Sequence, residues 1–131
     1  MITRDEIIDV CNRLGLVEIH SPILSDFRLW IFKNSIFSRQ HNAAIVVLAQ
    51  NPYEVISGNR LYFYDKLRYS SEDGGYNMES ADQYNAYCTK KGIDYTELFN
   101  KKTFEKAVCN VIKKIKKKEL DLKLARMMND F

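Results

Sequence analysis

Residues 103–131 read TFEKAVCNVIKKIKKKELDLKLARMMNDF, and this stretch decides the fold. Its first half spaces apolar residues alternately three and one apart, which is typical of one face of an α-helix. These residues are Phe104, Ala107, Val108, Val111, Ile112 and Ile115. The opposite side and its flank carry Lys106, Lys113, Lys114, Lys116, Lys117 and Lys118. Such a helix must pack its apolar face on a core that the preceding residues supply.

The second half of this stretch departs from the pattern. Lys118 and Glu119 stand where the apolar face would continue, although Leu122 and Ala125 keep to it. At about 100° per residue, four other apolar residues lie near the opposite side. These are Leu120, Leu124, Met127 and Phe131. We favour a helix that ends near Lys117 and a chain that turns back. The alternative is a continuous helix whose second apolar side needs a partner or self-associates.

An N-terminal helix is predicted from about residue 4 to residue 14. Thr3 and Glu6 form a T-x-x-E capping box, which satisfies the first free N–H groups of a helix. Apolar residues recur at helical spacing after it, and Gly15 suits the left-handed residue that ends a helix.

Two dense apolar runs follow, Phe27–Phe32 and Ala43–Ala49. Periodicity does not distinguish a buried strand from a buried helix here. Because Ile45, Val46 and Val47 are β-branched, we interpret both runs as central strands, joined by the polar residues 33–42.

A hairpin is predicted around Gly58-Asn59, a pair that suits a two-residue type II′ turn. Its strands would be residues 54–57 and 60–64. Side chains alternate along a strand, so Tyr62 and Tyr64 should share one side of the sheet, near Arg60.

The polar residues 70–77 indicate a loop with paired glycines. Two further capping boxes follow, Ser80-x-x-Gln83 and Asp94-x-x-Glu97, and each predicts the start of a helix. We therefore expect an α+β fold: an N-terminal helix, a small antiparallel sheet of three or four strands with a central hairpin, and C-terminal helices packed on one face.

Composition predicts a single domain over residues 1–131. Hydrophobic residues make up 46% of the chain, and there are only 5 Gly and 2 Pro, too few for a flexible linker. Neither a signal peptide nor an apolar run of about 20 residues is present, so we expect no membrane segment. The three cysteines are far apart and form no C-x-x-C pair, which favours a reducing compartment, the cytoplasm of a cell or of an infected host cell.

Charge is divided unevenly along the chain. Residues 1–89 hold 8 Lys/Arg and 11 Asp/Glu, a net charge of −3, whereas residues 90–131 hold 12 and 6, a net charge of +6. This distribution suits an acidic partner at the C-terminal end.

Catalytic patterns are scarce. His20 and His41 belong to no metal-ligand spacing, and no nucleotide-binding or hydrolase motif occurs. We therefore assign no catalytic residue, metal or cofactor. A metal-dependent nuclease using Glu54, Asp65 and Lys66 is a weak alternative, because that spacing is not specific. No motif names a family.

Binding to a macromolecule is the better-supported class. Lysines 113, 114, 116, 117 and 118 could meet phosphates, and Arg60 with Tyr62 and Tyr64 could stack single-stranded bases. A winged helix-turn-helix is disfavoured, because its recognition helix, residues 42–50, would be almost wholly apolar. Exposed tyrosines, Tyr76 in the glycine loop above all, are typical anchors of protein interfaces.

We expect a small, non-catalytic accessory or regulatory protein that binds another macromolecule, a protein first and nucleic acid as the alternative. Abundant Lys, Asn, Ile, Tyr and Phe have A/T-rich codons, which suggests a phage or mobile-element inhibitor of a host protein.

Overall fold

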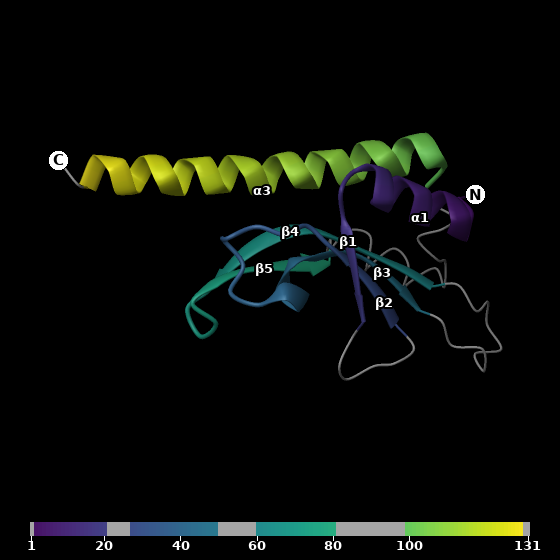
Figure 1. Cartoon of the computed structure of the whole chain (residues 1–131), viewed down its shortest axis with the longest axis horizontal. Coiled ribbons are helices and arrows are strands. Elements are labelled where there is room, and N and C mark those ends of the chain that lie inside the picture. The colour runs from purple at the N-terminus through teal and green to yellow at the C-terminus, as the bar shows by residue number, and fades with distance from the viewer. Residues whose placement is uncertain (1, 21–26, 50–59, 81–98, 130–131) are drawn as a thin grey trace.

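The computed structural model describes residues 2–20, 27–49, 60–80 and 99–129 (Figure 1). Its elements, in chain order, are α1 (Arg4–Arg13), β1 (Val17–His20), β2 (Phe27–Ile31), the 3-10 turn η1 (Gln40–Ala43), β3 (Ala44–Ala49), β4 (Arg60–Ser70), β5 (Gly75–Ser80) and α3 (Lys101–Asn129). An N-terminal helix, an antiparallel sheet and a C-terminal helix confirm the predicted α+β class.

Helix α1 begins and ends where the sequence predicts. The Thr3 hydroxyl accepts a hydrogen bond from the Glu6 N–H, and the Glu6 carboxylate accepts one from the Thr3 N–H, which completes the capping box. At the other end Gly15 has a φ of +82°, a conformation that residues with a Cβ rarely adopt.

Over the described ranges the sheet has five strands in the order β1-β2-β3-β4-β5, all antiparallel, rather than three or four. Both runs interpreted as central strands are strands, β2 and β3. The sequence does not predict two of the sheet's strands, β1 and β5. Residues Gly75–Asn77, predicted as part of a loop, belong to β5. The loop between β4 and β5 spans only residues 71–74, because Ser70 already pairs with Gly75.

The two faces of the sheet differ in what covers them. Figure 1 shows α1 and α3 on the same side of the sheet. Trp30 and Phe63 belong to a buried cluster with Phe104 of α3 and Ile7 of α1. On the opposite face lies a smaller cluster of Ile31, Ala43, Ala44 and Val47, to which η1 contributes.

The outer edge of β5 is covered by the chain that follows β2. The Tyr76 N–H donates to the Ile36 carbonyl oxygen at 2.9 Å. Phe37 and Tyr76 form an isolated parallel β-bridge. A Cβ on Gly75 would lie 3.0 Å from the Ser38 nitrogen, so glycine permits this close approach.

Helix α3 runs without interruption for 29 residues, so the favoured break near Lys117 is wrong. The stretch contains no Gly or Pro, and Leu, Lys, Glu, Ala, Arg and Met are strong helix formers. The helix also begins earlier than Thr103. The side-chain oxygen of Asn100 accepts from the Thr103 N–H at 2.9 Å, and the Thr103 hydroxyl accepts from the Asn100 N–H at 3.0 Å.

Some predictions fall outside the described residues. These are the turn at Gly58-Asn59 with its first strand, and the helices expected after Ser80 and Asp94. None of the described helices combines the length and hydropathy that crossing a bilayer requires.

Candidate macromolecule-binding surface

The first half of α3 is fixed to the body by its apolar face. Phe104, Val108 and Ile115 are fully buried. The Phe104 ring meets the rings of Phe63 and Phe99 edge-on, with centroids 6.2 and 5.6 Å apart. Packing of this kind fixes which side of α3 faces away from the sheet.

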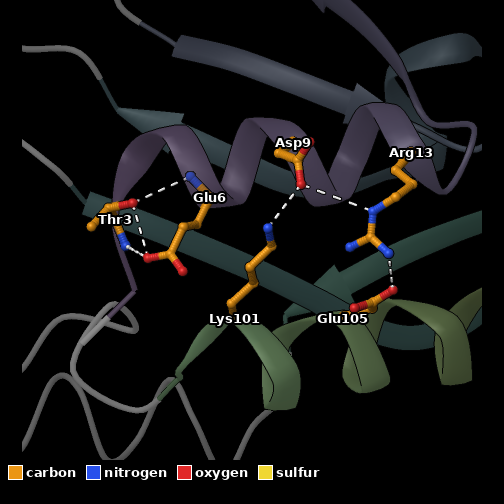
Figure 2. A network of polar contacts seen from close by, with 6 residues as sticks. All are labelled: Thr3, Glu6, Asp9, Arg13, Lys101 and Glu105. Atoms are coloured by element: carbon orange, nitrogen blue, oxygen red, sulfur yellow. Dashed lines mark hydrogen bonds and ion pairs between the residues drawn. The ribbon is translucent and has the colours of Figure 1, made fainter.

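An ion network joins α3 to α1 (Figure 2). Arg13 pairs with Glu105 and, at 3.9 Å, with Asp9, while the Lys101 ammonium lies 3.1 Å from Asp9. The hydrogen bond from Arg13 lowers the pKa of Glu105. These side chains are largely exposed, so they orient the two helices more than they stabilise them.

The outward side of α3 is cationic along its first half. Lys102, Lys106, Lys113 and Lys117 lie within about 60° of one another at 100° per residue, and we call these four the lysine face. All four are exposed, and among the described residues no carboxylate lies within ion-pair distance of any of them.

A groove follows the side of α3 next to β4. It has a volume of about 470 Å³ and includes Asn110, Lys113, Lys114 and Lys117 in its lining. The register of β4 with β5 shifts between Tyr64 and Lys66, which leaves Asp65 in a bulge. The Lys114 ammonium donates to the Asp65 carbonyl oxygen at 3.4 Å, so the bulge helps to position one wall of the groove.

Lys118 is placed differently from the other predicted lysines. It is half-buried, with its ammonium 5.8 Å from the centroid of the Tyr76 ring. The Tyr76 ring in turn meets the Tyr69 ring edge-on at 5.3 Å. Tyr76 therefore packs on the body in strand β5, instead of standing at the end of a glycine loop. Lys116, by contrast, is exposed.

The second half of α3 exposes the apolar side that the continuous-helix alternative predicts. Leu120, Leu124, Met127 and Met128 are 56%, 48%, 58% and 78% exposed, and we call these four the α3 tip. Every residue from 123 to 129 is exposed. In Figure 1 the yellow end of α3 projects past the β4–β5 turn. Phe131 lies outside the described residues.

The tyrosine pair lies on the other side of the sheet. Leu61 and Phe63 are buried under α3, whereas Tyr62 and Tyr64 are half-buried against the smaller cluster. Both tyrosines and His41 contribute to a hollow of about 560 Å³, and burial raises the pKa of Tyr64. The lysines and this tyrosine pair are therefore not parts of one site. The Arg60 side chain lies outside the described residues.

The described residues do not assemble the weaker catalytic candidates. No three His, Cys, Asp or Glu side chains within the described ranges could share a metal ion. The Glu18 carboxylate pairs with the Arg28 guanidinium, at 2.5 and 2.9 Å. Glu54, a member of the nuclease alternative, lies outside the described residues.

Sequence reasoning missed three members of these surfaces: Lys102, Asn110 and Met128. Lys102 and Met128 could have been found by extending the helix to its true start and by accepting that it continues to its end, whereas Asn110 lies inside the predicted helix, at the edge of its lysine side. Each then lies within about 60° of Lys113 on the outward side.

Comparisons of this chain with protein families, with curated proteins and with solved structures give no match.

Proposed function

We propose that this protein is a non-catalytic accessory protein that binds another protein through the α3 tip. The supporting observation is a rigid helix end that exposes four large apolar side chains and projects from the body. Apolar groups gathered in this way on a soluble domain mark interaction sites. Covering the exposed part of each side chain would contribute on the order of 1 kcal/mol.

The spacing of the tip matches one mode of protein recognition. Leu120, Leu124, Met127 and Met128 stand at i, i+4, i+7 and i+8, the anchors that an amphipathic helix presents to an apolar groove. Methionine side chains adapt to irregular surfaces. Because the helix is already formed, little ordering entropy opposes binding.

A second copy of the chain is one such partner, through antiparallel pairing of two tips. The narrower form of the proposal, a phage or mobile-element inhibitor of a host protein, is supported by the codon-linked composition alone.

Site-specific photo-crosslinking in the native cell tests the proposal. A photoreactive phenylalanine analogue at position 124 should give a discrete crosslinked product. The same analogue at Lys33, which is exposed on a different part of the surface, is the control. Leu120→Asp with Met127→Asp, in the chain that carries the analogue at 124, should abolish the product without lowering the melting temperature. Equal crosslinking from positions 124 and 33 would refute the proposal.

Light scattering then separates the two kinds of partner. A dimer that the Leu124→Asp substitution dissolves identifies a second copy. A wild-type monomer at high concentration excludes self-association and leaves a different protein as the partner.

A further inference from the structure

The lysine face precedes the α3 tip along the same outward side of α3 and has different chemistry. From Lys102 to Lys117 it extends about 22 Å along a straight helix, at 1.5 Å per residue. The residues between its lysines on the same side are Cys109, which is half-buried, and Asn110. No large apolar side chain interrupts the row.

Within the part of the chain that the structure describes, no carboxylate pairs with the lysines of this face. Ion pairs flank it: Lys101 with Asp9 before it, and Lys123 with Glu119 after it. Between them, the only acidic residue of α3 is Glu105, and Arg13 pairs with it. The lysine face therefore keeps its positive potential toward solvent.

The groove beside β4 widens this cationic surface. Lys113 and Lys117 belong both to the lysine face and to the groove, and Lys114 and Asn110 extend it toward β4, where Asp65 is the one acidic residue of the lining. An anionic chain on the outward side of α3 could thus contact ammonium groups from two directions, with the Asn110 amide as a further donor.

We propose that the lysine face binds the phosphate groups of a nucleic-acid backbone without reading its sequence. A straight row of about 22 Å matches a linear polyanion and spans about six phosphates of one strand at 3.4 Å each. Lysine ammonium groups bind phosphate as point charges. Sequence-specific contacts to base edges favour arginine, whose guanidinium group donates two hydrogen bonds at once. An anionic membrane is the competing surface, because the α3 tip continues the same side of the helix with exposed apolar side chains that could insert, and vesicle binding is therefore measured beside oligonucleotide binding.

Fluorescence anisotropy with labelled duplex and single-stranded oligonucleotides of scrambled sequence tests this inference between 50 and 200 mM salt. The variant Lys106→Gln, Lys113→Gln, Lys117→Gln should lose about tenfold or more in affinity. Its slope of log K against log salt on duplex should be shallower by about 2.7, at 0.9 per phosphate contact.

The matched control removes three charges elsewhere. Arg4→Gln, Lys33→Gln, Arg39→Gln changes the net charge equally, at exposed positions outside α3. It should keep the wild-type salt slope. An equal loss in the two variants, or a flat salt response of the wild type, would overturn the inference. So would tighter binding to phosphatidylserine vesicles than to oligonucleotides.

The α3 tip provides an independent readout. Leu124→Gln, which removes an apolar side chain without adding charge near the lysine face, should leave oligonucleotide binding unchanged, and the lysine variant should leave crosslinking from position 124 unchanged. Failure of one proposal is therefore distinguishable from failure of the other. Loss of oligonucleotide binding in Leu124→Gln would contradict the assignment of binding to the lysine face.

Discussion

Two aliphatic residues on α3 should differ sharply in what they contribute to stability. Ile115 is fully buried between the helix and the sheet, whereas Leu124 is 48% exposed on the α3 tip. Truncation to alanine removes three carbons from either side chain. The helix and the chemical change are therefore the same, and only the surroundings differ.

The expected loss for Ile115→Ala follows from burial. Three methylene equivalents at about 0.8 kcal/mol each give roughly 2.4 kcal/mol of lost transfer free energy. A cavity adds to this, and the better helix propensity of alanine subtracts a few tenths. We expect about 3 kcal/mol in total, a large share of a typical stability of about 5–15 kcal/mol. For Leu124→Ala we expect a change within about 0.5 kcal/mol.

Urea denaturation measures both values. With an m-value of about 2 kcal/mol/M, Ile115→Ala should lower the midpoint by about 1.5 M and leave the slope unchanged. The measurement is made at two protein concentrations, because self-association through the tip would make the stability of the wild type depend on concentration. Similar losses for the two variants, or a loss below about 1 kcal/mol for Ile115→Ala, would show that α3 does not pack as described.

Three further outcomes are expected. Burial raises the pKa of the Cys11 thiol to about 12 from an ordinary value of 9.0. Because the thiol ionises at lower pH in the unfolded chain, the free energy of unfolding should fall as pH rises above 9. Alkylation of Cys11, followed by mass spectrometry, should occur only when the protein unfolds. The hydrogen bond from Arg28 lowers the pKa of Glu18 from 4.5. The pair therefore stabilises the fold above pH 4.5, and this stabilisation is lost as pH falls. Arg28→Met should therefore cost about 1 kcal/mol in urea at pH 7 and much less at pH 3; an equal cost at both would contradict the ion pair. Gly15→Ala should cost about 1–2 kcal/mol in thermal unfolding, because the site is spacious but φ is +82°; a neutral result would argue against a left-handed residue there.

The sequence was informative where local chemistry decides the structure. The Thr3–Glu6 capping box and Gly15 define α1 because their hydrogen bonds and backbone angles involve near neighbours only. The apolar face of α3 was also predictable, since helical periodicity persists from Phe104 to Ile115, about three turns. The β-branched run Ile45–Val47 correctly indicated a buried strand.

Prediction failed for strands whose formation depends on pairing with strands distant in the sequence. β1 is a short edge strand whose residues run exposed, half-buried, half-buried, exposed, so it lacks a clear alternation. In β5 the alternation exists: Tyr76 and Met78 pack on the main cluster, while Asn77 and Glu79 lie toward the other face. The neighbouring glycines concealed it, because paired glycines favour a turn.

The sequence indicated which residue types to consider for binding but not how they are arranged. Most of the predicted lysines are exposed on α3, whereas Tyr62, Tyr64 and Tyr76 are half-buried, and which face each residue occupies depends on the packing of α3. The helix was expected to end near Lys117 because a second apolar side would otherwise remain exposed. That exposure is the feature on which the proposed function depends.

The segment that covers the outer edge of β5 has a consequence for behaviour in concentrated solution. An open edge strand offers free N–H and C=O groups to the sheet of another molecule, which is a route to aggregation. The Ile36 carbonyl oxygen accepts the hydrogen bond of the Tyr76 N–H, so that group is not free to pair with another molecule. The absence of a side chain at Gly75 lets residues 36–38 lie close against β5. A bulkier residue at position 75 would displace residues 36–38 from the edge of β5. We expect such a variant to form fibrils on prolonged incubation.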